Sequence, residues 1–181
     1  MPSSRGDKVG WMTWFVCLFC IQCGTSEKPH ASVTCAERLL SIEKSEAMAF
    51  RNETGDAMAL QTLAKAYADF ANACHDAPET PEMLFRRADI LRGLGKHHEA
   101  LALYRDVHDH FDRYEKRSVC AFLVAFIYDA ELGDRSQAIK AYNEVLSIHP
   151  DTEASRWSAL ALKSLGEPVD EPADLGLELG L

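Results

Sequence analysis

Apolar residues recur at helical spacing through most of the chain, and residues 33–166 contain no stretch of strand-like alternation. Glycines, prolines and capping residues divide this region into separate segments. We therefore predict an all-α fold with seven helices, over residues 33–50, 56–74, 80–94, 97–111, 114–132, 135–148 and 152–165. Asp56, Thr80 and the pair 151–152 are the expected N-caps of the second, third and last helices.

The fifth and seventh helices have particular places in this arrangement. Residues 119–128 hold no charged side chain, and a helix that is apolar on every side is buried on every side. The last helix has no second helix after it, which is typical of a terminal capping element. Arg156 and Trp157 on this helix are either exposed recognition residues or, for Trp157, a lid over the preceding helix pair.

Two segments of the chain repeat at a fixed offset. Residues 95–107 and 133–145 align so that four landmarks coincide, always 38 positions apart. The matching pairs are Gly95 with Gly133, Ala100 with Ala138, Tyr104 with Tyr142 and Val107 with Val145. Such a repeat indicates a hairpin of two helices that stacks on its neighbours to bury its apolar face.

Each repeated position has an expected structural role. The glycine ends the first helix of the hairpin with a positive φ. The alanine lies where the two helices approach most closely, so only a small side chain fits. The tyrosine lies four residues later on the same face and fills the gap to the next hairpin. Pro150 ends the second unit, because proline cannot continue a helix.

A more divergent copy of the unit is predicted upstream. Its landmarks have the internal spacing of Ala138, Tyr142, Val145 and Pro150, and they are Ala66, Phe70, Ala73 and Pro78. This interpretation gives about three helical hairpins followed by the capping helix.

The spacing of small, aromatic and small residues before a proline resembles the tetratricopeptide repeat (TPR). The unit of 38 residues exceeds the usual TPR period of about 34, and Asp112 stands where the middle unit would carry its proline. The surplus falls at residues 113–116 and 131–132, which we interpret as lengthened helix ends. The resemblance implies a right-handed α-solenoid over residues 33–166.

Several further short sequence segments are similar to those of TPR lipoproteins from Bacteroidota-type bacteria. They lie at residues 84–89, 94–95, 125–129 and 132–134. Those lipoproteins are distant relatives of the outer-membrane-assembly lipoproteins (BamD-like). The resemblance spans about residues 35–166 and implies a role in envelope or outer-membrane assembly.

The first 23 residues have the pattern of an export signal. Arg5 and Lys8 precede an uncharged apolar run over residues 9–23, and a polar tether follows over residues 24–32. The run is shorter than the about 20 residues of a membrane span. Cys23 resembles a bacterial lipoprotein junction, although the residues before it depart from the usual small-residue pattern. We expect acylation of Cys23 and a lipid-anchored protein of the outer membrane or periplasm. A plain secretory signal and an uncleaved short anchor are the alternatives.

The charge of the chain bears on its partners. The net charge is −9, and residues 1–22 carry +1, which leaves −10 for the remainder. An acidic chain without a basic patch is a poor binder of nucleic acid and of anionic lipid. Membrane attachment is therefore expected only through the N-terminal lipid.

Residues 167–181 form an acidic tail with a regular pattern of leucines. Leu175, Leu177, Leu179 and Leu181 alternate with Gly and Glu. Alternation of this kind fits a strand that pairs with a sheet edge, whereas the Pro, Gly and acidic content fits a disordered tail.

Two patterns could suggest a metal site, and we interpret neither as one. The cysteines at positions 17, 20 and 23 have a spacing found in metal and iron–sulfur sites, but they lie within the apolar signal. The histidines lack the i, i+4 spacing of helical zinc ligands, so we expect solvated side chains for His97, His98, His108 and His110. No cofactor is expected.

Three further cysteines belong to the helical region. In a hairpin that turns near residues 51–56, Cys35 and Cys74 face one another at the open end. They form either a disulfide, in an oxidising compartment, or two small buried thiols. Cys120 lies in the most apolar helix and is expected in the core.

No nucleophile elbow, zinc-protease helix or phosphate loop occurs in the sequence. We therefore expect a non-enzymatic scaffold that holds a protein partner in the groove lined by the first helices of the hairpins. The expected contact residues are Arg86, Arg87, Asp89, Arg92 and Asp129. Two alternatives stay open: a redox or metal-handling exported protein, and a module that associates with itself.

Overall fold

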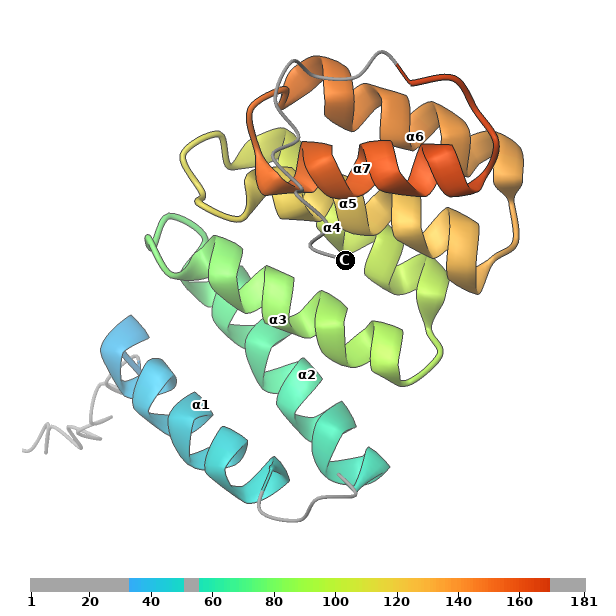
Figure 1. Ribbon diagram of the computed structural model, residues 1–181. Coiled ribbons are helices and arrows are strands. Elements are labelled where there is room, and N and C mark those ends of the chain that lie inside the picture. Colours follow the sequence, from blue (N-terminus) through green and yellow to red (C-terminus); the bar gives the residue numbers. More distant parts are fainter. Residues whose placement is uncertain (1–32, 51–55, 170–181) are drawn as a thin grey trace, which may run out of the picture. The chain divides into compact units, whose positions relative to one another are not determined.

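The computed structural model describes residues 33–50 and 56–169. These residues form seven α-helices and one π-helical segment and contain no strand, which confirms the predicted all-α fold. The elements are α1 (Cys35–Ala49), α2 (Ala57–Ala73), α3 (Thr80–Gly93), α4 (His97–His110), α5 (Arg117–Phe126), η1 (Ile127–Glu131), α6 (Arg135–Ile148) and α7 (Glu153–Ser164) (Figure 1).

Polar side chains fix the start of four of these helices. The Thr34 hydroxyl accepts from the Glu37 amide, while the Glu37 carboxylate accepts from the Thr34 amide at 2.8 Å. The bond from the Thr34 amide, followed by one from the Thr34 hydroxyl, lowers the pKa of the Glu37 carboxyl. Asp56 caps α2 as predicted, and Asp134 and Thr152 cap α6 and α7 in the same way. The first amides of these helices thus have side-chain acceptors.

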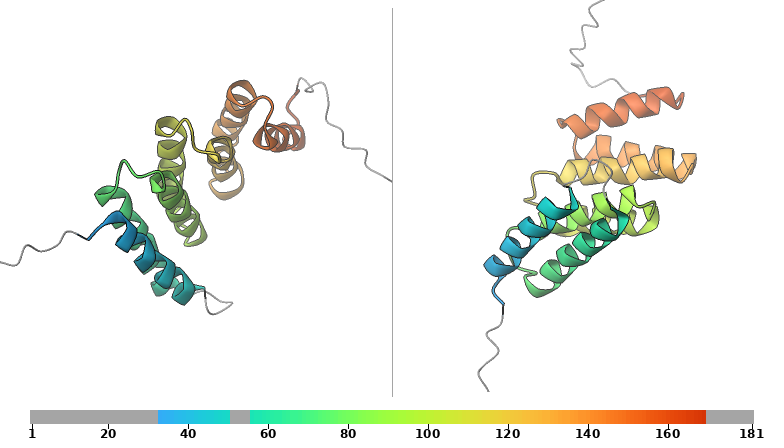
Figure 2. Two further views of the ribbon diagram at one scale, coloured as in Figure 1. Left: turned by 90° about the vertical axis from the view of Figure 1, so that its left-hand side faces the viewer. Right: turned by 90° about the horizontal axis from the view of Figure 1, so that it is seen from below.

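Successive helices pack as antiparallel pairs. The pairs are α1 with α2, α3 with α4, and α5 and η1 with α6, and each pair also contacts the next (Figure 2). Gly95 and Gly133 turn the chain inside the second and third pairs with φ of +74° and +66°, as the sequence predicts. The last helix, α7, packs on both α5 and α6 and closes this end of the α-solenoid.

Two apolar clusters fill the space between the helices. One joins α1, α2 and the α3 side chains Met83 and Ile90, and the other joins α3 to α7. Ala100 and Ala138 are 0 % exposed, which is the close approach that we expected of them. Replacing their methyl groups by larger side chains would force the paired helices apart.

The predicted upstream copy of the repeat has the wrong register. The buried landmarks of α2 are Leu63, Tyr67 and Phe70, whereas Ala66 is only partly buried. The helix ends agree with this corrected alignment, because the equivalent residues Cys74, Phe111 and His149 are the C-caps of α2, α4 and α6. Leu63 thus occupies the position that Ala100 and Ala138 occupy in the later hairpins, and Tyr67 that of Tyr104 and Tyr142.

The predicted ends of two other helices also need correction. Thr80 is the first residue of α3 rather than its cap, and its buried hydroxyl donates to the Cys74 carbonyl oxygen at 2.5 Å. Residues 111–116 form a loop instead of a lengthened helix, and α5 begins at Arg117. The second surplus, predicted at residues 131–132, lies at the end of η1, whose wider π-helical turn accommodates extra residues without unfolding the helix.

The fifth helix is less buried than its composition predicts. None of residues 116–129 is exposed, but only Cys120, Val124, Ala125 and Ile127 are fully buried. Helices α4, α6 and α7 cover the remainder incompletely, so that Phe122 and Phe126 stay partly accessible. Burial raises the pKa of the Cys120 thiol to about 12 and keeps it protonated.

A disulfide joins Cys35 to Cys74, with 5.9 Å between the two Cα atoms. It links the first residue of α1 to the C-cap of α2, at the open end of the first hairpin. Among the described residues no helix is both long and apolar enough to cross a membrane. The signal predicted over residues 1–23, Cys23, the tether over 24–32 and the leucines of the tail lie outside the described residues.

Candidate functional site

The same hydrogen bond occurs in all three hairpins. A buried tyrosine of the second helix donates its hydroxyl to a carboxylate of the first helix, from Tyr67 to Glu46 at 2.5 Å, from Tyr104 to Asp89 at 2.5 Å and from Tyr142 to Asp129 at 3.3 Å. Burial first, and the adjacent carboxylate second, raise the pKa of each tyrosine, so all three remain neutral donors.

These bonds give two of the predicted groove residues a structural role. Asp89 and Asp129 hold the first helix of their hairpin on the second, and the tyrosine hydroxyl bonds within its own hairpin. A carboxylate has about four acceptor sites and the tyrosine uses one. Both carboxylates, which are only partly buried, therefore retain acceptor capacity on the first-helix side.

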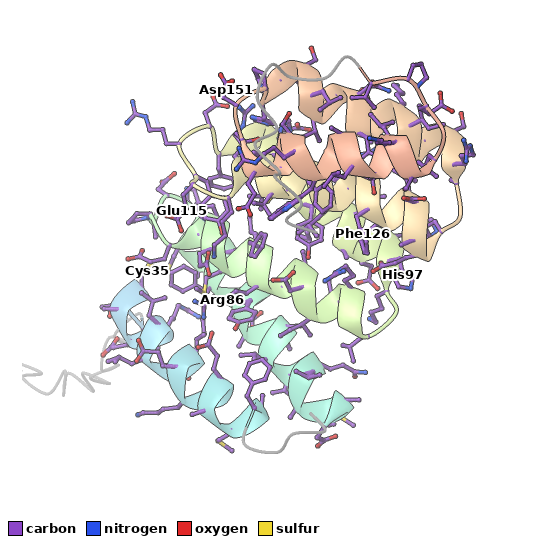
Figure 3. All side chains as sticks on the ribbon, in the orientation of Figure 1. Cys35, Arg86, His97, Glu115, Phe126 and Asp151 are labelled. Carbon is purple, nitrogen blue, oxygen red and sulfur yellow. A yellow bond between two sulfur atoms is a disulfide. The ribbon has the colours of Figure 1, made fainter. Side chains whose placement is uncertain are left out.

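Arg86 is the centre of a larger network. Its Nη1 and Nε lie 2.7 Å from a carboxylate oxygen of Glu46 and of Glu82. The second oxygen of Glu82 accepts from Tyr114 at 2.5 Å and from Lys116 at 2.8 Å. Arg86 thereby connects α3 with α1, and Glu82 connects α3 with the α4–α5 loop. The side chain of Arg86 lies between α1 and α3 in Figure 3.

The network sets the charges on this surface. Burial alone would raise the pKa of Glu82, but hydrogen bonds from Lys116, Tyr114 and Arg86 outweigh it and lower the pKa to about 2. The hydrogen bond that Arg86 donates to Glu82 also raises the pKa of Arg86. Both groups are therefore fully ionised at neutral pH and are held in fixed positions.

Two depressions in the surface meet at Arg86. One, of about 340 Å³, lies between α1, α2 and α3 and includes Glu46, Phe50 and Asp89. The other, of about 1130 Å³, lies between the α2–α3 turn and the α4–α5 loop, and its rim includes Arg113 and Glu115. We call the two depressions together the Arg86 surface. Charged side chains of both signs line it beside apolar ones such as Phe50 and Phe111.

Arg92 occupies a separate part of the first-helix side. Its Nη1 lies 3.3 Å from Glu131 and its guanidinium lies 5.8 Å from the centre of the Phe126 ring. Glu131 also contacts His97 Nδ1 at 2.6 Å. The buried Nε of Arg92 has no hydrogen-bond partner among the described residues. Arg92 therefore ties α3 to the π-helical end of the fifth helix.

Of the five predicted groove residues, only Arg86 and Asp89 line the same depression. Arg92 pairs with Glu131, Asp129 bonds to Tyr142, and Arg87 faces another side of α3. Arg87 lines a depression of about 240 Å³ with residues of α2 and α4, including Lys65 and Glu99. Arg86 instead contacts α1. Consecutive residues of a helix point about 100° apart, which accounts for the separation.

Sequence reasoning did not identify Glu46, Glu82, Tyr114 and Lys116 as parts of this surface. The Glu82–Arg86 pair was recognisable from its i, i+4 spacing. The other contacts join residues from 32 to 40 positions apart, and only the folded arrangement brings them together.

The histidines take several different roles. His110 pairs with Asp106 on α4. The expectation of a solvated side chain is wrong for His108, which is largely buried and has its Nε2 3.1 Å from Nε2 of His149. Among residues 33–50 and 56–169, no three His, Cys, Asp or Glu side chains are grouped as they would be in a metal site. Burial first, then His108 and Arg117, lower the pKa of His149.

The family comparison agrees with this geometry. Residues 79–151 match the family model described as tetratricopeptide repeat, and this range contains the hairpins α3–α4 and α5–α6. Proteins built from such repeats generally bind other proteins and are typically not enzymes. No curated protein matches the chain. The α1–α2 hairpin lies outside the matched range, yet it has the same tyrosine–carboxylate bond. Residues 79–151 are thus similar to tetratricopeptide repeats, and the described residues as a whole form an α-solenoid of helical hairpins.

Proposed function

We propose that this protein is a non-enzymatic scaffold that binds a protein partner at the Arg86 surface. The observation that carries the proposal is the meeting of two depressions at one fixed arginine, on the first-helix side of a TPR-type stack. Depressions of this kind accept side chains of a docked segment, and rigid charges orient it.

The lining of the surface indicates the chemistry of the partner. The charges of Glu46, Glu82, Arg86 and Lys116 balance one another within the network. Arg113 and Glu115 are exposed and form no ion pair with the other described residues, so they are available to a partner. We expect a polar segment of mixed charge whose binding weakens as the salt concentration rises.

We further propose that the scaffold acts outside the cytoplasm, in the cell envelope. The disulfide between Cys35 and Cys74 supports this, because disulfides persist mainly in oxidising compartments. Acylation of Cys23 and a part in outer-membrane assembly rest on the sequence resemblance. An intact mass that includes an N-terminal diacylglycerol at Cys23 supports the anchor, and a mass that still includes residues 1–22 contradicts it.

Capture of the partner from the native cell tests the binding proposal. The chain is expressed with an affinity tag as wild type, Arg113→Glu or Arg87→Glu, crosslinked in the cell and purified, and captured proteins are identified by mass spectrometry. Arg113 lies on the Arg86 surface and Arg87 does not, so Arg113→Glu should reduce capture while Arg87→Glu leaves it unchanged. Equal capture by all three proteins would place the partner elsewhere.

A further inference from the structure

Helix α7 presents an exposed face that combines apolar and basic side chains. Trp157 and Leu160 are 37 % and 46 % exposed, and Arg156 and Lys163 lie beside them on the same face. The opposite face packs on α5 and α6 through Ala154, Ser155, Ser158, Ala159 and Leu162. Glu153 and Ser164 are also exposed, and Glu153 lies one turn before Arg156 and Trp157 on the same side. We call Arg156, Trp157, Leu160 and Lys163 the α7 face; with Glu153 included, this side of the helix keeps a net charge of about +1.

The α7 face has no partner among the described residues. The first helices α1, α3 and α5 are each covered by the second helix of their own hairpin, and within residues 33–50 and 56–169 no such helix follows α7. Trp157 touches Phe122 with 5.3 Å between the ring centres, which leaves its other side open. Arg156 and Lys163 form no ion pair within residues 33–50 and 56–169.

The chain turns back immediately after α7. Gly166, with a φ of +77°, ends the helix, and the Glu167 amide donates to the Leu162 carbonyl oxygen. The Arg135 guanidinium then holds the Leu165 carbonyl and the Glu167 carboxylate. Val169 packs against the core cluster of α3 to α7. The last described residues, 165–169, therefore lie against the solenoid.

Residues 170–181 are complementary to the α7 face in charge and in apolar character. They carry four carboxylates and no Lys or Arg, and their four leucines alternate with smaller or acidic residues. Twelve residues can reach about 40 Å when extended, whereas the twelve residues of α7 span about 18 Å. The segment is long enough to run back along the whole face.

We propose that residues 170–181 dock on the α7 face and act as an intramolecular cap of the solenoid. Leucines of the segment cover Trp157 and Leu160, and its carboxylates pair with Arg156 and Lys163. This contact takes the place of the missing second helix and keeps the face from binding a second copy of the chain. It is independent of the Arg86 surface and of the partner bound there.

Fluorescence of Trp157 in the full chain tests the proposal. Trp11→Phe and Trp14→Phe leave Trp157 as the sole tryptophan. In this background, Leu177→Ser with Leu179→Ser should shift the emission to longer wavelength and increase quenching by acrylamide. The matched control is Leu40→Ser, at an exposed leucine of α1, which should change neither signal. Circular dichroism verifies that each variant is folded.

Charge reversal separates docking from a general loss of structure. Lys163→Glu should increase the quenching of Trp157, and Glu178→Lys together with Asp174→Lys in the same chain should reverse that increase. Unchanged quenching after the leucine substitutions would overturn the proposal. Quenching that falls as protein concentration rises would also overturn it, because a second copy would then be the occupant. Capture of the partner through Arg113 should be the same in all these variants.

Discussion

At the scale of single residues, the buried tyrosines carry much of the specificity of the hairpins. A Leu or Phe at these positions would fill the core equally well, but it would leave the facing carboxylate without its buried donor. Tyr104 is 0 % exposed and bonds to Asp89, while Tyr128 is partly exposed and bonds only to Arg105. The two tyrosines therefore form a natural pair for comparison.

We predict that Tyr104→Phe lowers the free energy of unfolding by about 1.5–3 kcal/mol, the range for hydrogen bonds to charged groups. Tyr128→Phe should change it by less than about 0.5 kcal/mol, as surface substitutions usually do. Urea denaturation of the two variants measures both values. An equal effect of the two substitutions would show that the hydroxyl of Tyr104 adds nothing to the stability that its ring provides.

The stability of the fold should depend on pH in two steps. The pKa of His149 is lowered in the folded protein, so the unfolded chain binds more protons than the folded one as the pH falls through 6.5, the ordinary pKa of histidine. Stability present above pH 6.5 is therefore lost as the pH falls toward the folded pKa of His149. Glu82, with a pKa of about 2 against 4.5, causes a second loss between pH 4.5 and about 2.

Urea denaturation at a series of pH values from 8 to 3 measures these steps. His149→Gln should remove the first step and keep the second, because Glu82 lies in a different network. Stability that is constant or increases between pH 7 and pH 5 in the wild type would contradict the assigned role of His149.

At the scale of helices, the closest contacts of each hairpin depend on one small side chain. Ala100 is fully buried between α3 and α4, whereas Ala102 on the same helix is exposed. We predict that Ala100→Leu destabilises the protein by about 1–3 kcal/mol through overpacking. Ala102→Leu should be close to neutral. Thermal unfolding of the two variants measures the difference, and a neutral Ala100→Leu would contradict the proposed packing.

The helices also show how far the sequence could be interpreted. The repeat between residues 95–107 and 133–145 predicted two hairpins and their turn glycines, because landmarks at one offset constrain each other. In the first hairpin Leu63 occupies the position of the small residue. An alignment based on alanine therefore places Ala66 at this position and shifts the register of the repeat by three residues. The tyrosine at 67 was the more reliable landmark, since its hydroxyl has a fixed partner.

The remaining errors have a common physical cause. The helix ends at residues 111–117 and 127–131 depend on contacts with side chains that are distant in the sequence, such as that of Tyr114 with Glu82. A local sequence pattern does not reveal such contacts. The candidate site was predictable only in part for the same reason. Arg86 and Asp89 follow from helix geometry, but the partners at residues 46, 114 and 116 do not.

At the scale of the whole molecule, the disulfide ties the first hairpin together at its open end. Cys35 and Cys74 are 39 positions apart, so the bond restricts a long loop of the unfolded chain. We predict that Cys35→Ser with Cys74→Ser lowers the free energy of unfolding by about 2–4 kcal/mol. Urea denaturation with and without a reductant checks this. Two results together would contradict the disulfide. They are an equal stability of the wild type with and without reductant, and three free thiols in residues 33–169 before reduction.

The fixed stack of hairpins positions the charges of the Arg86 surface, where we propose that a protein partner binds. Site-specific photocrosslinking in the native cell tests this proposal most directly. A photoreactive residue is placed at position 113, on the Arg86 surface, or at position 87, on the side of α2 and α4. The account predicts a discrete crosslinked protein partner from position 113 and none from position 87. A partner crosslinked from position 87 alone, or from both positions to the same extent, would contradict it.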